Sequence, residues 1–391
     1  MKVDFFVECG FFLSGGNLAF GTASLCLRID YLFKGYEWCG GWERYESPQR
    51  FAFIRRAPEN APISAFGTEQ ADQTPENPKM SIHWYPGHMR KASNEMIESL
   101  PLVNLVIEVL DARIPFSSSN PFIQDLVAEK PSIKILNKCD LADPEITKVW
   151  QEYYEQQDNT KTLALDLQHF DPSKQVIDLI NTLCPQKEGR NTLVMVTGIP
   201  NVGKSSLINC LAGRHMAKTG NEPAVTKGQQ RINLRNGIML LDTPGILWPK
   251  IENPNGSYRL ATTGAIRNTA VSYEDVAFFA AEFLLEKYPE LLQKRFKFET
   301  LPRSEIELLE IIGAQRGCLR SRGQVDLERV STIFVNELRA GTLGNVSFET
   351  PDIIDVEMQQ VQVLRAEKEE REKLRLEKAA ARRRKAKANR K

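Results

Sequence analysis

Residues 198–205 read Gly-Ile-Pro-Asn-Val-Gly-Lys-Ser, and this stretch decides the fold of the chain. It matches the phosphate-loop pattern G-x-x-x-x-G-K-[ST]. It follows an apolar run typical of a buried strand and precedes a segment with helical spacing of apolar residues. A chance glycine-rich turn is the alternative interpretation, and the flanking strand and helix patterns argue against it. The stretch therefore predicts a fold that binds the phosphate chain of a nucleotide.

The residue types of this loop have distinct chemical roles. Glycines let backbone N–H groups turn in on a phosphate, and the helix that follows presents its positive end. Lys204 would place a charge on the outer phosphates during catalysis, and the hydroxyl of Ser205 would bind Mg²⁺. The candidate nucleotide-binding residues of this stretch are Gly198, Asn201, Val202, Gly203, Lys204, Ser205 and Ser206.

A second motif, Asp-Thr-Pro-Gly at residues 242–245, ends a later apolar run. There Asp242 can reach the Mg²⁺ shell through a water, and the Gly245 N–H can face the γ-phosphate during catalysis. D-x-x-G alone is a weak signal, but a strand end after a phosphate loop is where it is expected. Between the two motifs, Thr226 is the candidate to close over Mg²⁺, and a solvent-facing loop threonine is the alternative.

A third motif, Asn-Lys-Cys-Asp at residues 137–140, indicates which base is bound. Asp140 can accept hydrogen bonds from N1–H and the exocyclic amine of guanine, whereas adenine would set a ring acceptor against the carboxylate. Such a mismatch can reject the wrong base by roughly 10⁴-fold. Asn137 would tie this motif to the phosphate loop, and the stem of Lys138 would cover the base. Without the phosphate loop, a strand-to-helix turn with an aspartate cap would be the better interpretation.

The order of the motifs is unusual, because residues 137–140 precede the phosphate loop, whereas the guanine motif normally follows D-x-x-G. We therefore predict a circularly permuted P-loop GTPase domain. Such a rearrangement is tolerated where the old termini lie close in space. It makes the segments around Thr226 and Gly245 lead directly into the C-terminal part of the chain.

Alternating strand and helix patterns predict an α/β domain with a mostly parallel sheet and helices on both faces. The expected strands are 102–110, 133–136, 163–165, 193–196 and 238–241, and the expected helices are 144–157, 173–183 and 204–212. Only helical patterns follow, at 273–288, 304–312 and 325–339. The expected organisation is a poorly patterned extension (1–79), the GTPase domain (80–250), a linker (251–272), a small all-α RNA- or ribosome-binding domain (273–350) and a charged, basic helical tail (351–391).

The extension at 1–79 has no sustained period and carries no chemistry. Met80 opens the first strongly patterned segment, so one interpretation is that the extension lies upstream of the true start. Seven scattered cysteines favour a reducing, intracellular compartment. Residues 5–27 are the most apolar stretch, but Glu8, Gly15, Gly16 and Asn17 interrupt it, so we expect no membrane role.

Further motifs resemble the circularly permuted ribosome-biogenesis GTPases, namely the ribosome biogenesis GTPase A family and its mitochondrial counterparts. Residues 83–92 (HWYPGHMRKA) resemble the opening W-F-P-G-H-M signature, and residues 111–115 (DARIP) resemble the D-A-R-x-P segment. Residues 316–319 and 323–326 resemble the C-terminal domain, so the resemblance covers about 80–349. It implies a cytoplasmic GTPase that binds GTP or GDP with Mg²⁺ and helps the large ribosomal subunit mature by contacting its rRNA. We expect it to be a monomer off the ribosome.

The resemblance also bears on catalysis. Ile246 occupies the position after D-T-P-G where many GTPases place a water-orienting glutamine, and an isoleucine cannot orient water. The resemblance points instead to His88 for water positioning, and the alternative is a histidine that packs at a helix start. Related GTPases with an asparagine at the position of Asn201 bind K⁺, so Asn201 is a candidate K⁺ ligand. The fifth nucleotide motif should fall near residues 164–166, where the match is poor.

Two functional hypotheses remain open. The first is a GTPase assembly factor whose nucleotide state controls docking on ribosomal RNA. The second is an RNA-binding module that binds GTP for structure and hydrolyses it negligibly; a P-loop kinase is disfavoured by the guanine motif. From residue 365 to 391 the chain has thirteen Lys and Arg against five Glu. Without interleaved aromatic residues, such a tail could contact RNA only through phosphates, and a solvated charged helix is the alternative.

Overall fold

The computed structural model describes residues 84–127, 130–186, 189–217, 228–321 and 323–388, with no side chains described beyond residue 379. The predicted extension at 1–79 and the candidate switch residue Thr226 therefore lie outside the described residues. No helix in the described part of the chain is long and apolar enough to cross a membrane.

A six-stranded sheet with the order β3-β2-β1-β4-β6-β5 forms the centre of the GTPase part. Every neighbouring pair is parallel except β5 and β6, which confirms the prediction of a mostly parallel sheet. The strands are β1 (Leu105–Asp111), β2 (Ser132–Asn137), β3 (Thr160–Leu165), β4 (Thr192–Thr197), β5 (Gln230–Asn233) and β6 (Ile238–Asp242). All residues of β1 are buried, as expected for a central strand covered on both faces.

Two expected features of the sheet need correction. β1 begins at Leu105 and not at residue 102, because Leu100–Leu102 form a 3-10 turn. The edge strand β5 was not predicted. It has four residues, of which only Ile232 is buried, so it offers no apolar alternation that a sequence pattern could reveal.

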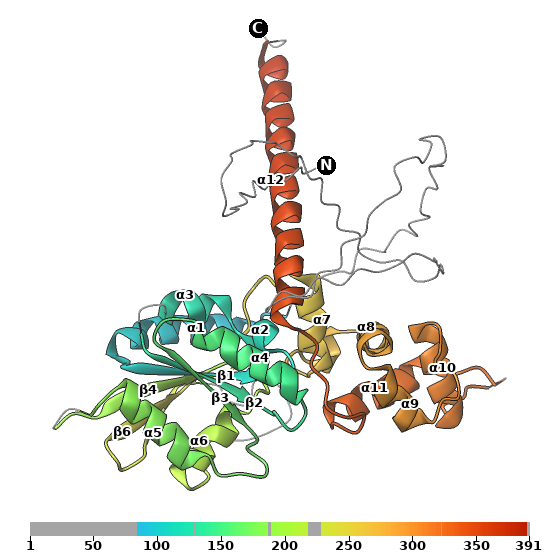
Figure 1. The fold of residues 1–391 in the computed structure, drawn as a ribbon. Coiled ribbons are helices and arrows are strands. Elements are labelled where there is room, and N and C mark those ends of the chain that lie inside the picture. Colours follow the sequence, from blue (N-terminus) through green and yellow to red (C-terminus); the bar gives the residue numbers. More distant parts are fainter. Residues whose placement is uncertain (1–83, 128–129, 187–188, 218–227, 322, 389–391) are drawn as a thin grey trace, which may run out of the picture. The chain divides into compact units, whose positions relative to one another are not determined.

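Helices cover both faces of the sheet. Figure 1 shows α1 and α3 on one face and α5 and α6 on the other, which confirms the predicted layers. The helices of this part are α1 (Gly87–Ser99), α2 (Pro115–Ser118), α3 (Pro121–Val127), α4 (Pro144–Glu155), α5 (Ser173–Leu183) and α6 (Lys204–Ala212). The main core lies between the sheet and these layers, and it continues into the helical part of the chain.

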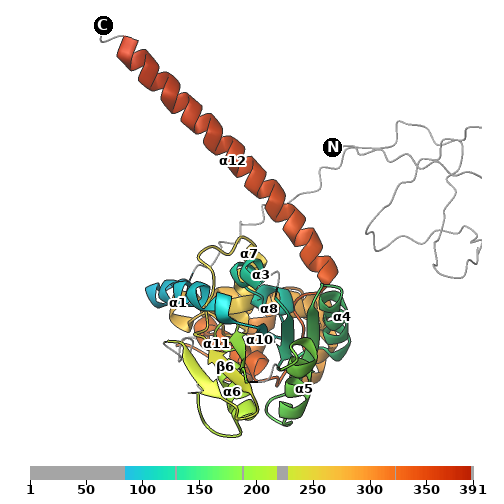
Figure 2. The ribbon, with the colours of Figure 1, turned by 90° about the vertical axis from the view of Figure 1, so that its left-hand side faces the viewer.

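Helices make up the regular structure of the described C-terminal part, apart from an isolated β-bridge between Leu319 and Val325. Its elements are α7 (Pro254–Thr262), the 3-10 turn η3 (Asn268–Ala270), α8 (Tyr273–Lys287), α9 (Pro289–Phe296), α10 (Glu305–Gln315), α11 (Leu327–Arg339) and α12 (Pro351–Ala388). α8, α10 and α11 pack on one another. The tail is a single unbroken helix, α12, in Figures 1 and 2.

The expected linker at 251–272 contains α7, so the description of this range as a plain linker is wrong. The turn-forming residues that suggested a loop serve as helix signals here. The Asn253 side chain caps the helix by accepting from Asn255 N–H, and Pro254 occupies the first turn, where it costs no hydrogen bond. Residues 256–262 are all buried, so α7 belongs to the packed interior.

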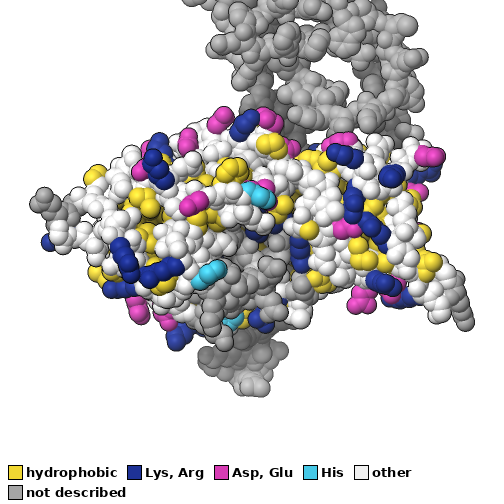
Figure 3. All heavy atoms as spheres, turned by 90° about the horizontal axis from the view of Figure 1, so that it is seen from below, with side chains coloured by type: hydrophobic (Ala, Val, Ile, Leu, Met, Phe, Trp, Pro, Cys, Tyr) yellow, Lys and Arg dark blue, Asp and Glu magenta, His cyan; other side chains and the backbone are white. Residues whose placement is uncertain are grey.

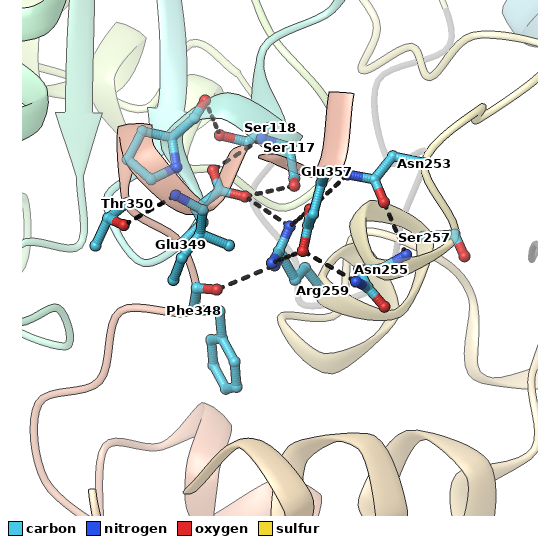
Figure 4. Close-up of polar contacts among 12 residues, drawn as sticks. Ser117, Ser118, Asn253, Asn255, Ser257, Arg259, Phe348, Glu349, Thr350 and Glu357 are labelled. Atoms are coloured by element: carbon cyan, nitrogen blue, oxygen red, sulfur yellow. Dashed lines mark hydrogen bonds and ion pairs between the residues drawn. The ribbon is translucent and has the colours of Figure 1, made fainter. Parts of the chain in front are cut away.

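We call residues 348–357, which end the preceding loop and begin α12, the root of α12. A buried polar cluster joins this root to α7 and α2 (Figure 4). Arg259 of α7 donates to both carboxylate oxygens of Glu357 at 2.7 Å and to the carbonyl of Phe348 at 3.0 Å. Glu349 accepts from the N–H and hydroxyl of Ser117 at 2.9 and 2.5 Å, and it lies 3.7 Å from Arg259. Burial raises the pKa of Glu349, and Arg259 opposes this shift. The beginning of the tail is thus held by charge and not by apolar packing alone.

Candidate functional site

The phosphate loop leaves β4 and enters α6 through residues with positive φ angles: 145° at Gly198, 62° at Asn201 and 100° at Gly203. A Cβ atom at Gly198 would collide with the carbonyl oxygen of Val109, and one at Gly203 with the side-chain amide of Asn137. Both glycines are therefore required by backbone conformation and by space.

Asn137 ends β2 and connects the guanine motif to the phosphate loop. Its Nδ2 donates to the carbonyl oxygen of Val202 at 2.6 Å, and only 4% of the residue is exposed. The geometry has the contact that sequence reasoning expected between these two loops. Because both ends are buried, the bond fixes the spacing between the segment expected to read the base and the segment expected to hold the phosphates.

Lys204 and Asp242 bring opposite charges into a buried position. Lys204 Nζ donates to the carbonyl of Ile199 at 2.7 Å, and burial lowers its pKa to about 8, against the opposing attraction of Asp242. Burial raises the pKa of Asp242 to about 6, although Lys204 opposes the shift. Among the described residues, neither carboxylate oxygen of Asp242 has a hydrogen-bond partner. A buried carboxylate without hydrogen bonds is costly, and a cation in its vicinity would remove that cost.

Gly245 brings the D-T-P-G segment against the phosphate loop. A Cβ atom at Gly245 would lie 2.9 Å from the backbone nitrogen of Pro200 and 3.0 Å from Lys204 Nζ. The Thr243 hydroxyl donates to the carbonyl of Val196 at 2.8 Å, which anchors the segment to β4. The two phosphate-facing motifs predicted from the sequence are therefore in direct contact.

The guanine motif is linked through Lys138 to a buried charge cluster, which Asp111, Arg113 and Lys138 form. Lys138 has a φ of 62°, and its Nζ donates to Asp111 Oδ2 at 2.8 Å. Arg113 binds the same carboxylate through two hydrogen bonds of 2.9 and 2.7 Å. Asp140 is half-buried; desolvation raises its pKa, and the nearby Asp166 adds to the rise. The Lys138 stem is thus fixed at its tip, while the Asp140 carboxylate is partly accessible for a ligand.

The segment after β3 lies beside this motif. Cys139 N–H donates to the carbonyl of Leu165 at 3.2 Å. The Asp166 carboxylate accepts from the N–H of Gln168 at 2.9 Å and contacts His169 Nδ1 at 2.5 Å. Burial opposes the change, but these hydrogen bonds lower the pKa of Asp166. Residues 164–166 thus lie beside the guanine motif, and a role for them as a fifth nucleotide motif stays a prediction.

His88 lies in the first turn of α1 and is exposed. The next residue, Met89, is fully buried, and its sulfur accepts from Leu247 N–H at 3.5 Å. His88 is therefore carried by a helix that contacts the segment following D-T-P-G.

Asn201, the candidate K⁺ ligand, reaches the helical part of the chain. Its Nδ2 donates to the carbonyl of Gly264, just after α7, at 2.8 Å. The amide nitrogen is thus used in a protein contact that joins the phosphate loop to the residues after α7.

Comparison with known proteins decides the family. A sequence profile described as "50S ribosome-binding GTPase" matches residues 193–295. Ribosome biogenesis GTPase A from Priestia megaterium is 43% identical over 282 residues, which cover 70% of this chain and 98% of that protein. The chain belongs to the ribosome biogenesis GTPase A family.

Two further relatives agree with this assignment. The crystal structure of GNP-bound YlqF from Thermotoga maritima has a TM-score of 0.50 at 31% identity and covers 67% of this chain and 98% of that one. Mitochondrial ribosome-associated GTPase 1 from Xenopus tropicalis is 37% identical over 228 residues, which cover 55% of this chain and 72% of that protein. The chain is therefore a circularly permuted P-loop enzyme that hydrolyses GTP.

The residues of this ribosome biogenesis GTPase fit a bound Mg²⁺. The Asp242 oxygens are buried without hydrogen bonds within the described chain, and Ser205 stands in the first turn of α6. Carboxylate and hydroxyl oxygens are ligands that suit this cation. Thr226, the third expected ligand, lies outside the described residues.

Asp111 and Arg113 are contributors to the GTPase site that we did not predict. They were noticed only as part of the family-like segment at 111–115, with no role assigned. Their signal was a carboxylate at a strand end, next to the strand that carries the guanine motif. Parallel strands bring their carboxyl ends to one edge, so a side chain there was a candidate for contact with Lys138.

Proposed function

We propose that this GTPase binds the large ribosomal subunit in the cytoplasm and promotes a late step of its maturation, with GTP hydrolysis as the switch between docking and release. Family membership supports a role in ribosome assembly. The observation that carries the proposal is the contact of Asn137 with the phosphate loop beside the buried Lys204–Asp242 pair. It unites a guanine reader and a triphosphate site in one permuted domain.

The site residues act on GTP as follows. Asp140 accepts from the guanine edge, Lys138 covers the base, and the loop from Gly198 to Ser206 surrounds the phosphates. Lys204 and the Gly245 N–H stabilise charge on the γ-phosphate as water attacks phosphorus and the bond to the bridging oxygen breaks, which releases GDP and phosphate. Ser205, Thr226 and Asp242 would hold Mg²⁺, which would supply positive charge against the phosphates. Asn201 would hold K⁺, which would offset charge that develops between the β- and γ-phosphates.

His88 orients the attacking water in this proposal, because Ile246 is fully buried and has no polar side-chain atom. The exposure of His88 suits a residue that completes the site only when the partner docks. This would make turnover slow in the free protein and faster on the ribosome.

RNA contact is assigned to the basic tail and the helical domain. In Figure 3, the Lys and Arg side chains of one face are spread in small groups among Asp and Glu, with no continuous basic patch. The tail is different, since thirteen Lys and Arg outnumber five Glu between residues 365 and 391. It would neutralise rRNA phosphates while the protein itself stays a monomer off the ribosome.

The test is steady-state GTP turnover with and without large ribosomal subunits, in K⁺ and in Na⁺, for wild type and His88→Ala. We expect stimulation by the subunit, faster turnover in K⁺, and a loss of roughly 10²-fold in the variant with unchanged GTP affinity. Subunit binding without any stimulated turnover would instead favour an RNA-binding module that uses GTP for structure. A variant with normal turnover would return His88 to a structural role.

A further inference from the structure

A charged pair lies in the sheet, separate from the nucleotide residues. Glu108 of β1 and Lys134 of β2 form an ion pair of 2.7 Å, and they are only 4% and 5% exposed. Lys134 Nζ also lies 4.8 Å from the ring centre of Tyr154. Burying two charges costs free energy that burying apolar side chains of similar size would not cost. The stability of the sheet alone therefore does not explain the pair.

The other oxygen of Glu108 fixes the start of α3. Glu108 Oε1 accepts from the hydroxyl of Ser119 at 3.0 Å and from the N–H of Asn120 at 3.1 Å. Asn120 is completely buried, and its Oδ1 accepts from the N–H of Phe122 at 3.1 Å. Both the backbone and the side-chain oxygen of Asn120 are therefore held in one orientation.

In this orientation the side-chain NH₂ group of Asn120 faces the segment after D-T-P-G. Asn120 Nδ2 donates to the carbonyl oxygen of Ile246 at 3.1 Å. The same peptide unit is held from its other side, because Leu247 N–H donates to the sulfur of Met89 at 3.5 Å. The peptide group between Ile246 and Leu247, one residue beyond Gly245, is thus held by α1 and by the residue that precedes α3.

We propose that Asn120 is a positioning residue for GTP hydrolysis. Through the Ile246–Leu247 peptide it fixes where Gly245 stands against the γ-phosphate, and through Met89 it couples this segment to the helix that carries His88. This inference depends on the proposed function in one respect, since the catalytic roles of His88 and Gly245 are taken from it. Glu108, which is paired with Lys134, holds the backbone of Asn120 in this orientation.

Asn120→Ala removes the donor to Ile246, and Ser119→Ala is the matched control. Ser119 also donates to Glu108 Oε1 but makes no contact with Ile246. We expect Asn120→Ala to lose roughly tenfold in kcat, the effect of one buried hydrogen bond, with GTP and GDP affinities within about twofold of wild type. Ser119→Ala should keep kcat within about twofold.

Hydrogen exchange of the peptide covering residues 243–248 supplies a readout that does not depend on turnover. We expect faster exchange there in Asn120→Ala and an unchanged rate in Ser119→Ala. Met89→Leu keeps the core volume but removes the sulfur that accepts from Leu247 N–H, so it should also speed exchange of that N–H. If Asn120→Ala does not fold, this variant tests whether the Ile246–Leu247 peptide is held in place. Unchanged exchange and turnover in Asn120→Ala, or equal losses in Ser119→Ala, would overturn the proposal. A wild type without stimulated turnover would refute the proposed function, while the exchange data would still decide whether Asn120 holds the segment.

Discussion

The aspartate carboxylates near the GTPase motifs differ in burial and in the charges beside them. Asp111 is buried between two cations, Arg113 and Lys138, and Asp242 is buried near one. Asp140 is half-buried and close to another carboxylate, Asp166. A carboxylate that is neither paired nor fully solvated is suited to accept hydrogen bonds from a neutral donor such as the guanine edge. Base choice should therefore depend on Asp140 alone.

Replacement of Asp140 by Asn tests this base choice. The amide presents a donor where the carboxylate accepted, so we expect Asp140→Asn to lose roughly 10²-fold or more in GTP affinity and to bind xanthine nucleotides better. Fluorescence titration with labelled guanine and xanthine nucleotides would measure both. Unchanged guanine affinity would contradict the assignment of residues 137–140 as the base reader.

The Asp111 cluster makes a prediction about pH. Burial raises the pKa of Asp111, but the charges of Arg113 and Lys138 outweigh it and hold the pKa well below its ordinary value. A depressed pKa in the folded protein means that the contribution to stability is complete above the unfolded value of about 4 and is lost as pH falls through the folded value.

We therefore expect Asp111→Asn to lower the free energy of unfolding by about 3–5 kcal/mol, because it leaves two buried cations without their partner. The difference from wild type should be the same at pH 5 and pH 8 and should shrink only below about pH 4. Urea denaturation of both proteins across this range would measure it. A difference that is absent at pH 7 would show that the cluster does not stabilise the fold.

At the scale of elements, α7 is the helix that contacts both the helical domain and the beginning of the tail. Arg259 reaches the root of α12, and Arg339 of α11 donates to the carbonyls of Ala261 and Thr262 at 2.6 and 2.9 Å. Just beyond the helix, Gly264 accepts from Asn201 of the phosphate loop. The nine-residue helix α7 and the Gly264 carbonyl just after it thus contact the phosphate loop, the helical domain and the tail.

Arg259→Met should release the root of α12, because it strands Glu349 and Glu357 without their shared cation. We expect the free energy of unfolding to fall by about 3–5 kcal/mol, with faster hydrogen exchange at residues 351–361. Arg365→Met is the matched control, since the exposed Arg365 lies 4.0 Å from Glu252, and its loss should cost about 0.5 kcal/mol or less. Equal effects of the two substitutions would mean that the root of α12 is not held by Arg259.

The contrast between α7 and the main sheet explains how much the sequence could reveal. Buried parallel strands such as β1 and β4 are mostly apolar, and the phosphate and guanine motifs lie at the ends of β4 and β2, so the strands and the motifs could be predicted. Asn253 and Pro254 are equally common in turns and at helix starts, and only tertiary burial decides between the two. The contact of Asp111 with Lys138 and that of Asn120 with Ile246 link residues distant in sequence, and no local pattern encodes them.

At the scale of the whole molecule, the permuted order places the D-T-P-G segment immediately before the helical domain. We expect a change at Gly245 on hydrolysis to reach α7 first, because α7 follows the D-T-P-G segment in the chain and Gly264, just after α7, accepts from Asn201 of the phosphate loop. The excess of positive charge lies beyond the helical domain, in the tail, which is the part of the chain that we propose to contact RNA phosphates.

Deletion of residues 359–391 tests the tail. Removing the thirteen Lys and Arg between residues 365 and 391 should leave GTP affinity unchanged, weaken binding to large subunits and flatten the dependence of that binding on salt concentration. Filter binding over a salt series would give both slopes. The same slope with and without the tail would remove it from the RNA interface.

Nucleotide-controlled docking is the central claim, and co-sedimentation with large-subunit precursors tests it most directly. The protein is mixed with precursors in GTP, in GDP and in a non-hydrolysable GTP analogue, and the bound fraction is measured in each. We expect the analogue to give the largest bound fraction and GDP the smallest, since the docked state is the one that contains the γ-phosphate. Equal binding in all three nucleotide states, or no binding in any, would contradict the account.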